Sequence, residues 1–360
     1  MLKKKRVVVA MSGGVDSSVT AALLLEEGYE VIGITMRLMG FDEQGNRERS
    51  CCGLQEVEEA RRVAGRLKIP HYVLDFEEEF REGVVEYFCQ EYARGRTPNP
   101  CIPCNQKLKF GKLLEKAKGL GIQWVASGHY ARVSYDDERG RYLLKRGIDR
   151  TKDQSYVLFN LTQEQLKHLL FPLGRLEKKK VREIAKGLGL RVHNLPDSQE
   201  ICFVPDGDYG NFLRKKMPEI MKPGPIVDKG GKVLGQHKGI HLFTIGQRRG
   251  LGVAASRPLY VISIDREKRT VVVGGDEDVY RSELVATDVN WIAVDRLTEP
   301  MPVKAQIRYR HLPAEALLMS LPEGGDIKVE FKKPQKAITP GQAVVFYRGE
   351  EVVGGGWIRD

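Results

Sequence analysis

Apolar and polar positions follow two different patterns in the two halves of this 360-residue chain. In the first half, four short apolar runs rich in β-branched residues have the length of buried parallel strands. Stretches with apolar residues at helical spacing lie between and after them. The strand runs are 7–11, 31–36, 71–76 and 124–127, and the helical stretches are 19–26, 54–68, 77–94 and 106–118. This alternation predicts an α/β fold built on a parallel sheet.

The helical pattern gives way to short alternating runs beyond Asp206. Before that point, a hairpin is predicted over 132–146 and helices over 163–170 and 177–188. After it, the runs 259–264 and 270–273 flank a turn and indicate small β structure. Strand-like runs at 288–294, 303–310, 316–321, 327–331, 343–347 and 352–358 predict a closed antiparallel barrel. We therefore expect three domains, comprising residues 1–205, a central β-rich domain at 206–282, and a barrel at 283–360.

The apolar run 7–11 leads into a glycine turn and then a helix, as in a phosphate-binding loop. Gly13 and Gly14 let the backbone turn sharply and bring N–H groups close to a ligand, while Ser17 and Ser18 lie at a helix N-terminus that favours negative charge. The loop contains neither Gly-Lys-Ser/Thr nor Gly-x-Gly-x-x-Gly. It therefore predicts an anion site of another kind, and a plain strand-to-helix turn is the alternative.

The charge balance indicates an anionic partner. Lysine and arginine number 58 against 48 acidic residues, which gives a formal net charge of +10. Nucleic acid is the first candidate partner, and a merely soluble basic surface is the alternative. The helix predicted at 177–188 is strongly basic, and we interpret its basic run as a solvated face, with RNA contact as the alternative. The basic residues of that helix are Lys178, Lys179, Lys180, Arg182 and Lys186.

The chain is predicted to be cytosolic, which bears on the role of its cysteines. The apolar run behind the basic residues 1–6 is too short for a signal-peptide core, and no membrane segment is evident. Six cysteines in a cytosolic chain of this length indicate catalytic or metal-binding roles rather than a disulfide framework. Cys89 lies on an apolar helical face and is predicted to be a buried small hydrophobe. The adjacent Cys51 and Cys52 receive no assignment.

Three other cysteines are candidates for chemistry. Cys101 and Cys104 form a Cys-x-x-Cys pair, and Cys202 follows far downstream. Three thiolates do not complete a tetrahedral zinc site, so structural zinc would need a further cysteine or a histidine. A reactive role fits better, because Cys104 is expected just before a helix, where the helix dipole lowers the pKa of a thiol.

Several motifs resemble those of known enzymes. The segment Ser12–Ser17 is similar to the Ser-Gly-Gly-x-Asp-Ser loop of the ATP pyrophosphatases, whose domain is adenine nucleotide α-hydrolase-like. With Thr-Pro-Asn-Pro at 97–100, Lys-Asp-Gln-Ser-Tyr at 152–156, Ser-Gln-Glu-Ile-Cys-Phe at 198–203 and a β tail, the whole chain resembles the bacterial tRNA-specific 2-thiouridylases. This resemblance implies that ATP adenylates the 2-carbonyl oxygen of the wobble uridine in tRNAs for lysine, glutamate and glutamine. Sulfur then displaces AMP to give 2-thiouridine.

The resemblance also implies roles for individual residues. Those expected to contact ATP are Ala10, Met11, Ser12, Gly13, Gly14, Val15, Asp16, Ser17, Met36 and Gly128. Asp16 would in addition help to hold Mg²⁺. Those expected to contact tRNA are Asn99, Pro100 and Cys101 at the target base, together with Lys152, Asp153, Gln154, Arg308 and Tyr309. We expect Arg308, Tyr309 and Arg310 to present cations and a stacking ring on one barrel strand.

The resemblance leaves two sulfur mechanisms open. In the persulfide scheme, Cys202 carries the sulfur supplied by a sulfur-relay protein or a cysteine desulfurase, and Cys104 is its partner nucleophile, so that the pair ends as a disulfide. Many members of the family have aspartate where this chain has Cys101. With Cys101, Cys104 and Cys202 together, the chain also resembles tRNA sulfurtransferases in which three cysteines hold a [4Fe–4S] cluster.

Two rival functions are compatible with parts of the sequence. One is another pyrophosphatase-loop ligase, such as a lysidine synthetase or an amide-forming synthetase, but those chemistries need no cysteine triad. The other is a non-catalytic tRNA-binding protein with a vestigial nucleotide site. A vestigial site predicts a degraded loop, whereas Ser12, Gly13, Gly14, Asp16 and Ser17 are all present.

Overall fold

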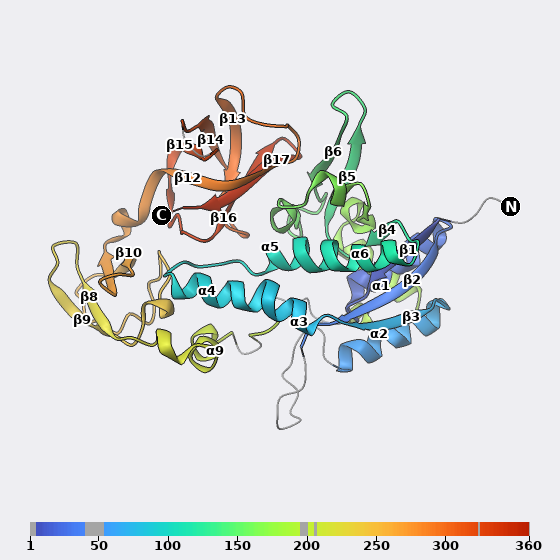
Figure 1. The fold of residues 1–360 in the computed structure, drawn as a ribbon, viewed down its shortest axis with the longest axis horizontal. Coiled ribbons are helices and arrows are strands. Elements are labelled where there is room, and N and C mark those ends of the chain that lie inside the picture. Colours follow the sequence, from blue (N-terminus) through green and yellow to red (C-terminus); the bar gives the residue numbers. More distant parts are fainter. Residues whose placement is uncertain (1–4, 40–53, 195–200, 205–206, 323–324, 360) are drawn as a thin grey trace. The chain divides into compact units, whose positions relative to one another are not determined.

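The computed structural model of the chain describes residues 5–39, 54–194, 201–204, 207–322 and 325–359 (Figure 1). The chain divides into two compact units. The first contains residues 1–85, 101–207 and the short turn at 349–352, and the second contains 86–100, 208–348 and 353–360. Cys51 and Cys52 lie outside the described residues, as do residues 198–200 of the motif that precedes Cys202. No described helix has the length and apolar character needed to cross a membrane.

The first unit is built on a parallel sheet whose described strands follow the order β3-β2-β1-β4-β7. The strands are β1 (Arg6–Ala10), β2 (Glu30–Arg37), β3 (His71–Asp75), β4 (Trp124–Ala126) and β7 (Leu169–Leu170). All four predicted runs form strands, so the predicted α/β class is confirmed. The chain extends the sheet to one side of β1 through β2 and β3, and to the other through β4. The loop after β1 therefore lies at the switch point where such sheets bind ligands.

Strand β7 replaces the end of a predicted helix. The sequence predicts a helix over 163–170, but α7 ends at Leu166 (Gln163–Leu166). Its start is fixed by a capping box between Thr162 and Gln165. Its end is displaced because the backbone of β4 takes up the next residues: Val125 N donates to His168 O at 3.0 Å, and Ser127 N donates to Leu170 O at 3.2 Å. Pairing with the edge of the sheet is thus favoured over continuation of the short helix.

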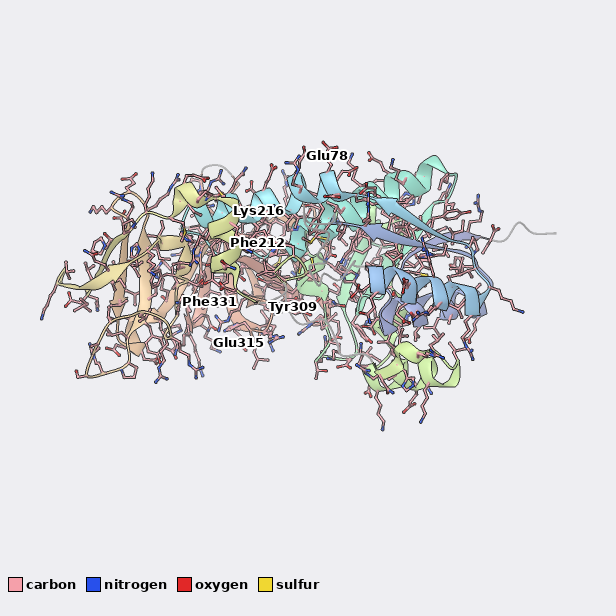
Figure 2. The ribbon with its side chains drawn as sticks, turned by 90° about the horizontal axis from the view of Figure 1, so that it is seen from below. Glu78, Phe212, Lys216, Tyr309, Glu315 and Phe331 are labelled. Carbon is pink, nitrogen blue, oxygen red and sulfur yellow. The ribbon has the colours of Figure 1, made fainter. Side chains whose placement is uncertain are left out.

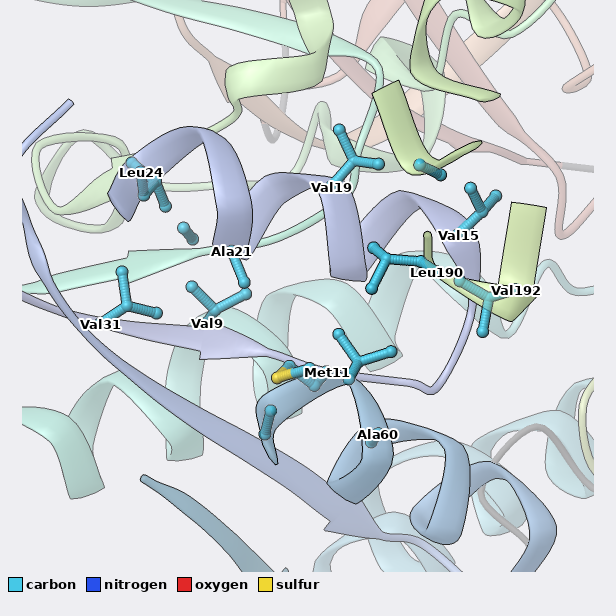
Figure 3. Packing of buried hydrophobic residues seen from close by; sticks show 14 of the residues in the cluster. Val9, Met11, Val15, Val19, Ala21, Leu24, Val31, Ala60, Leu190 and Val192 are labelled. Atoms are coloured by element: carbon cyan, nitrogen blue, oxygen red, sulfur yellow. The ribbon is translucent and has the colours of Figure 1, made fainter. Parts of the chain in front are cut away.

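Three helices of the first unit build one core with β1. They are α1 (Val15–Glu26), α2 (Leu54–Leu67) and α8 (Lys178–Gly187). Figure 3 shows Val9 and Met11 of the β1 segment packed with Val19 and Leu24 of α1, each no more than 1% exposed. Ala60 of α2 belongs to the same cluster. The loop between β1 and α1 is therefore anchored in the core at both ends.

Two predicted long helices are each interrupted by a π-helical stretch. The first consists of α3 (Glu77–Phe80), η1 (Arg81–Glu86) and α4 (Tyr87–Ala93), and the second of α5 (Cys101–Pro103), η2 (Cys104–Lys112) and α6 (Leu113–Gly119). The predicted start of the second helix at residue 106 is wrong, because helical structure begins at Cys101. Pro103 fits there because the first turn of a helix needs no backbone N–H donor.

The predicted hairpin and the remaining short helices complete the first unit. The hairpin is confirmed as β5 (Ala131–Asp136) and β6 (Arg141–Arg146), which pair throughout. The turn at 349–352 joins this hairpin, where Arg132 Nη2 donates to Glu350 Oε2 at 3.0 Å and Arg139 Nη1 to Glu351 Oε2 at 2.9 Å. The short helices are η3 (Ser155–Leu158), η4 (Pro172–Arg175) and η5 (Arg191–Asn194).

The second unit contains a small sheet and a closed barrel. The small sheet has the order β10-β11-β8-β9, and the barrel strands follow the order β12-β15-β14-β13-β16-β17, closed by pairing of β12 with β17. The predicted antiparallel barrel is confirmed. Side chains alternate across its wall, so that Phe331 of β15 is 4% exposed in the core while Glu315 of β14 is exposed (Figure 2).

The elements of the second unit have the following bounds. The helices besides α4 are α9 (Tyr209–Lys216), η6 (Pro218–Ile220), η7 (Ile240–Leu242) and η8 (Asp276–Val279). The small sheet comprises β8 (Gly224–Val227), β9 (Val233–His237), β10 (Tyr260–Asp265) and β11 (Thr270–Gly274). The barrel comprises β12 (Tyr280–Trp291), β13 (Met301–Gln306), β14 (Ala314–Ser320), β15 (Ile327–Lys336), β16 (Ala343–Arg348) and β17 (Glu351–Ile358).

A buried histidine in the second unit makes stability depend on pH. His241 is 1% exposed, and within the described chain neither of its ring nitrogens has a hydrogen-bond partner. Burial lowers the pKa of His241, and the nearby His237 and Arg214 lower it further. The unfolded chain therefore binds a proton below about pH 6.5 that the folded chain does not bind, so the free energy of unfolding falls as the pH drops below that value.

We expect the free energy of unfolding to fall by up to about 1.4 kcal/mol per pH unit for one histidine. Urea unfolding at pH 7, 6 and 5 measures it. Replacing His241 with Leu should make the dependence shallower, because the group that titrates is gone. The same replacement at the partly exposed His193 is the control. An unchanged pH slope in the His241→Leu variant would contradict the prediction.

Candidate active site

The loop between β1 and α1 is fixed by its own serines. Ser12 N donates to Ser17 Oγ at 3.2 Å, and Ser17 Oγ donates to the carbonyl oxygen of Gly14, also at 3.2 Å. Ser18 Oγ donates to the same carbonyl oxygen at 2.8 Å. Because Gly14 is the N-cap of α1, these bonds hold the loop against the helix N-terminus. The helix dipole and the backbone N–H groups there favour a phosphate group.

Two glycines of the predicted ATP site are required by close contacts. Gly13 has a φ of +75°, and a Cβ atom on it would lie 2.3 Å from the carbonyl oxygen of Glu56 in α2. Gly128 follows β4, and a Cβ atom on it would lie 2.8 Å from Cβ of Asp16. The structure thus brings Gly128 against the loop. Met36, another predicted ATP contact, is 6% exposed near the end of β2.

The carboxylate of Asp16 is held by two side chains from distant parts of the chain. Lys178 Nζ lies 2.7 Å from Oδ2 and 2.8 Å from Oδ1 of Asp16. Tyr130 OH donates to Oδ1 at 2.7 Å, and the Lys178 ammonium lies 5.6 Å from the centre of the Tyr130 ring. The side chain of Lys178 is only 10% exposed. A buried cation therefore compensates the one acidic residue of the loop.

The position of Lys178 corrects one prediction. The basic run of α8 is predicted to form a solvated face, which holds for Lys179, Lys180 and Lys186 because these are exposed. It is wrong for Lys178. This residue begins α8, and Val181 and Ala185, three and seven residues further on, are fully buried. Lys178 therefore lies on the buried stripe of the helix, and its helical phase was the signal that could have identified it.

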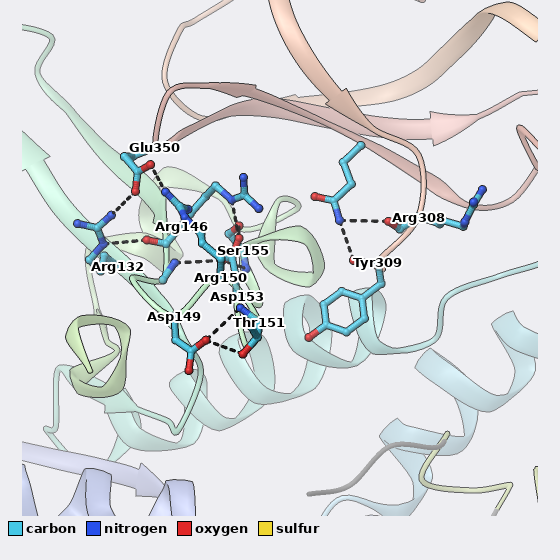
Figure 4. Close-up of polar contacts among 12 residues, drawn as sticks. Arg132, Arg146, Asp149, Arg150, Thr151, Asp153, Ser155, Arg308, Tyr309 and Glu350 are labelled. Carbon is cyan, nitrogen blue, oxygen red and sulfur yellow. Dashed lines mark hydrogen bonds and ion pairs between the residues drawn. The ribbon is translucent and has the colours of Figure 1, made fainter. Parts of the chain in front are cut away.

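The predicted tRNA segment 152–154 is tightly bonded inside the first unit (Figure 4). The side chain of Asp153 is 6% exposed; it accepts from Arg146 Nε at 2.7 Å and from Gly147 N at 3.1 Å. Gln154 Oε1 accepts from the backbone N–H of Tyr130 at 3.0 Å, and Gln154 N donates to the backbone carbonyl of Tyr130 at 3.0 Å. Asp153 and Gln154 therefore order this segment, and their contact with tRNA stays a prediction.

Arg308 and Tyr309 do not lie on a barrel strand as predicted. Strand β13 ends at Gln306, and the residues after it form a turn. The turn is stabilised by Gln306, whose Nε2 donates to the carbonyl oxygens of Arg308 at 3.1 Å and Tyr309 at 2.7 Å (Figure 4). The side chains of Tyr309 and Arg310 are exposed, whereas Arg308 is partly exposed and its Nη1 donates to the carbonyl oxygen of Lys336 at 3.0 Å.

Comparison with known proteins identifies the family. Models for the tRNA methyl transferase HUP domain, the tRNA methyl transferase PRC-barrel domain and the aminomethyltransferase beta-barrel domain match residues 5–206, 210–275 and 281–358, respectively. The tRNA-specific 2-thiouridylase MnmA of Acetivibrio thermocellus is 53% identical over 360 residues, covering 99% of this chain and 100% of its own length. That of Heliobacterium modesticaldum is 56% identical over 356 residues, covering 99% and 92%. The chain belongs to the tRNA-specific 2-thiouridylase family.

The cysteines of this 2-thiouridylase family member differ in exposure. Cys101 is exposed at the start of α5, whereas Cys104 is 7% exposed at the start of η2. The expectation that Cys104 just precedes a helix is therefore wrong by one turn. Cys202 is partly exposed, and Phe203 beside it is 1% exposed with its ring 5.7 Å from that of Phe80.

Two further observations concern the cysteines. Cys89 is 6% exposed, as predicted, and burial raises the pKa of its thiol to about 11. Among the described residues, no three His, Cys, Asp or Glu side chains are grouped so that they could hold a metal ion. The cysteines of a [4Fe–4S] cluster bind different irons, so the assignment of Cys101, Cys104 and Cys202 to a cluster stays a prediction.

Proposed function

We propose that this chain is an ATP-dependent sulfurtransferase that converts the wobble uridine of tRNA to 2-thiouridine. The full-length relatives named tRNA-specific 2-thiouridylase support both the reaction and the substrate. In the structure, the observation that carries the proposal is the preformed loop at 12–18, with Asp16 held by Lys178 and Tyr130 at the switch point of the sheet. Such a loop suits a nucleotide whose terminal phosphates leave together.

The carbonyl oxygen of uridine is a poor leaving group, which explains the need for ATP. The 2-oxygen attacks the α-phosphorus, the bond to pyrophosphate breaks, and AMP becomes attached to the base. Ser12, Ser17 and the N-terminus of α1 bind the departing phosphates, and Lys178 supplies a positive charge beside them. Asp16 would hold Mg²⁺ with the ATP phosphates in place of part of its bonding to Lys178 and Tyr130, which contact both carboxylate oxygens in the ligand-free chain. The metal would neutralise charge on the leaving group.

Sulfur then replaces the activated oxygen. In the persulfide scheme, a sulfur-relay protein or a cysteine desulfurase loads Cys202. The terminal sulfur attacks C2 of the base, and the bond from C2 to the adenylated oxygen breaks to release AMP. The thiolate of Cys104 attacks the sulfur of Cys202, which leaves 2-thiouridine and a disulfide between Cys104 and Cys202. A cellular dithiol must reduce this disulfide before the next turnover.

Contacts with tRNA are assigned to three segments. Asn99, Pro100 and Cys101 would contact the target base, and Lys152, with Asp153 and Gln154 ordering its segment, would contact the anticodon arm. The turn with Arg308 and Tyr309 would provide a cation and a stacking surface for a base or a phosphate. The substrates would be the tRNAs for lysine, glutamate and glutamine. The net charge of +10 supports binding of a polyanion.

One assay tests this proposal. The chain is incubated with ATP labelled at the α-phosphate, a persulfide donor and a tRNA transcript that carries uridine at the wobble position. We expect AMP and pyrophosphate, together with a tRNA that is retarded on a mercury-containing gel. The same transcript with cytidine at that position is the control and should give neither product.

Other outcomes would identify the rival functions. ADP as the tRNA-dependent product would exclude the adenylation chemistry, because the proposed reaction leaves the β and γ phosphates together. Modification of the cytidine transcript with lysine would indicate a lysidine synthetase. Binding of tRNA without any nucleotide turnover would indicate the non-catalytic alternative.

A further inference from the structure

Tyr130 connects the ATP loop to the segment assigned to tRNA. Its hydroxyl group donates to Asp16 Oδ1 at 2.7 Å. Its backbone N–H donates to the side-chain oxygen of Gln154, and its backbone carbonyl accepts from the N–H of Gln154, both at 3.0 Å. One residue therefore touches the acidic side chain of the loop with its ring and the segment 152–154 with both of its backbone groups.

The connection is stiff on both sides. Tyr130 is 3% exposed, and its neighbours Gly128 and Ala131 are in close contact with other backbone: a Cβ atom on Gly128 would lie 2.8 Å from the backbone carbon of Asp16. On the other side, Asp153 fixes the segment through Arg146 at 2.7 Å and through the backbone N–H of Ser155 at 3.1 Å. If residues 152–154 move, the packed groups around them leave little room for adjustment, so the Tyr130 ring moves as well.

The hydroxyl group of Tyr130 helps to set the orientation of the Asp16 carboxylate. Asp16 has two carboxylate oxygens: Lys178 bonds both, and Tyr130 bonds Oδ1. Lys178 and Tyr130 together therefore set the orientation of the Asp16 carboxylate relative to the phosphates of bound ATP. If tRNA shifts segment 152–154, the position of the phenol changes, and with it the orientation of the carboxylate. The affinity for ATP then differs between the tRNA-free and tRNA-bound states, which is the condition for coupling.

We propose that Tyr130 is a positioning residue that couples tRNA binding to the ATP loop through Asp16. This inference rests on the proposed function, because it takes segment 152–154 as a tRNA contact. It adds a regulation of the same site: ATP is bound in the orientation for adenylation only when tRNA has engaged segment 152–154. The benefit is that ATP is not consumed without an acceptor.

The test compares Tyr130→Phe with Tyr135→Phe. Both variants lose one phenolic oxygen, but Tyr135 is 51% exposed on β5 and serves as the matched control. For each protein, the dissociation constant of a non-hydrolysable ATP analogue is measured by calorimetry with and without tRNA. The ratio of the two constants is the coupling factor, and the same factor must appear when tRNA binding is measured with and without the analogue.

We expect a coupling factor of about 5 or more for the unmodified chain and for Tyr135→Phe, and a factor near 1 for Tyr130→Phe. A purely structural role would lower the melting temperature and weaken both ligands without changing the factor. Gln154→Ala, which removes the bond to the Tyr130 N–H, should lower the factor as well. Coupling that persists in Tyr130→Phe, or that is missing in an unmodified chain that thiolates tRNA, would overturn the inference. Failure to thiolate tRNA at all would instead overturn the proposed function.

Discussion

Replacement of Lys178 by Met is expected to slow tRNA-dependent pyrophosphate release by on the order of a hundredfold or more, comparable to the loss of one preorganised charge-stabilising donor. The ammonium group lies 2.7 Å from Asp16 in a side chain that is 10% exposed. It is therefore desolvated, preorganised and adjacent to the loop that binds the phosphates. Without the Lys178 ammonium group, the negative charge that develops on the departing pyrophosphate would be less stabilised. Release of labelled pyrophosphate in single-turnover reactions measures the effect.

The control for this prediction is Lys179→Met, because Lys179 is the next residue of α8 and is exposed. That variant should react at nearly the original rate. Lys178→Met also leaves Asp16 without its cation, which lowers stability by about 1 kcal/mol because Asp16 is partly exposed. Urea unfolding of both variants separates this loss of stability from the loss of rate. A rate for Lys178→Met that equals the rate for Lys179→Met would contradict the prediction.

The loop and the sheet could be predicted because their signals are local. Residues 7–18 contain the strand, the turn and the helix start in one continuous segment, and alternation of strands and helices places that segment in a parallel sheet. Lys178 lies 162 residues from its partner Asp16. A lysine on a basic helix is predicted to lie on the solvated face. Only its position relative to the buried residues of the helix distinguishes Lys178 from Lys179.

Two further errors have causes that the pattern of apolar and polar residues does not show. The strand predicted to include Arg308 ends at Gln306 because the Gln306 amide binds the turn that follows. The predicted strand begins at residue 288 and so includes only the end of β12, which has an irregularity where Asp288 has a φ of +48°. The first half of β12 pairs with β15 and the second half with β17. The alternation of apolar and polar residues at 280–287 identifies neither β15 nor β17 as the pairing strand.

Replacement of Cys202 by Ser is expected to abolish tRNA thiolation, with a loss of on the order of a thousandfold or more, while pyrophosphate release continues. Adenylation needs no thiol, whereas the persulfide that attacks C2 is carried by this sulfur. Cys104→Ser should behave in the same way, because a hydroxyl group cannot resolve the bond between Cys202 and the transferred sulfur. Thiolated tRNA is measured on mercury-containing gels, and pyrophosphate in the same reactions. Loss of both products in either variant would place that cysteine in folding or in ATP binding.

Cys101 separates the two sulfur mechanisms. Its side chain is exposed, whereas Cys104 is 7% exposed. In the persulfide scheme, Cys101→Ala is expected to retain thiolation within about threefold of the unmodified chain, since a persulfide pair does not use a third thiolate. Protein prepared without oxygen is assayed for iron, sulfide and visible absorption before each reaction. If the unmodified chain binds four irons and Cys101→Ala loses both the iron and the thiolation, three cysteines hold a cluster and the persulfide pair is excluded, because only cluster chemistry requires the third thiolate.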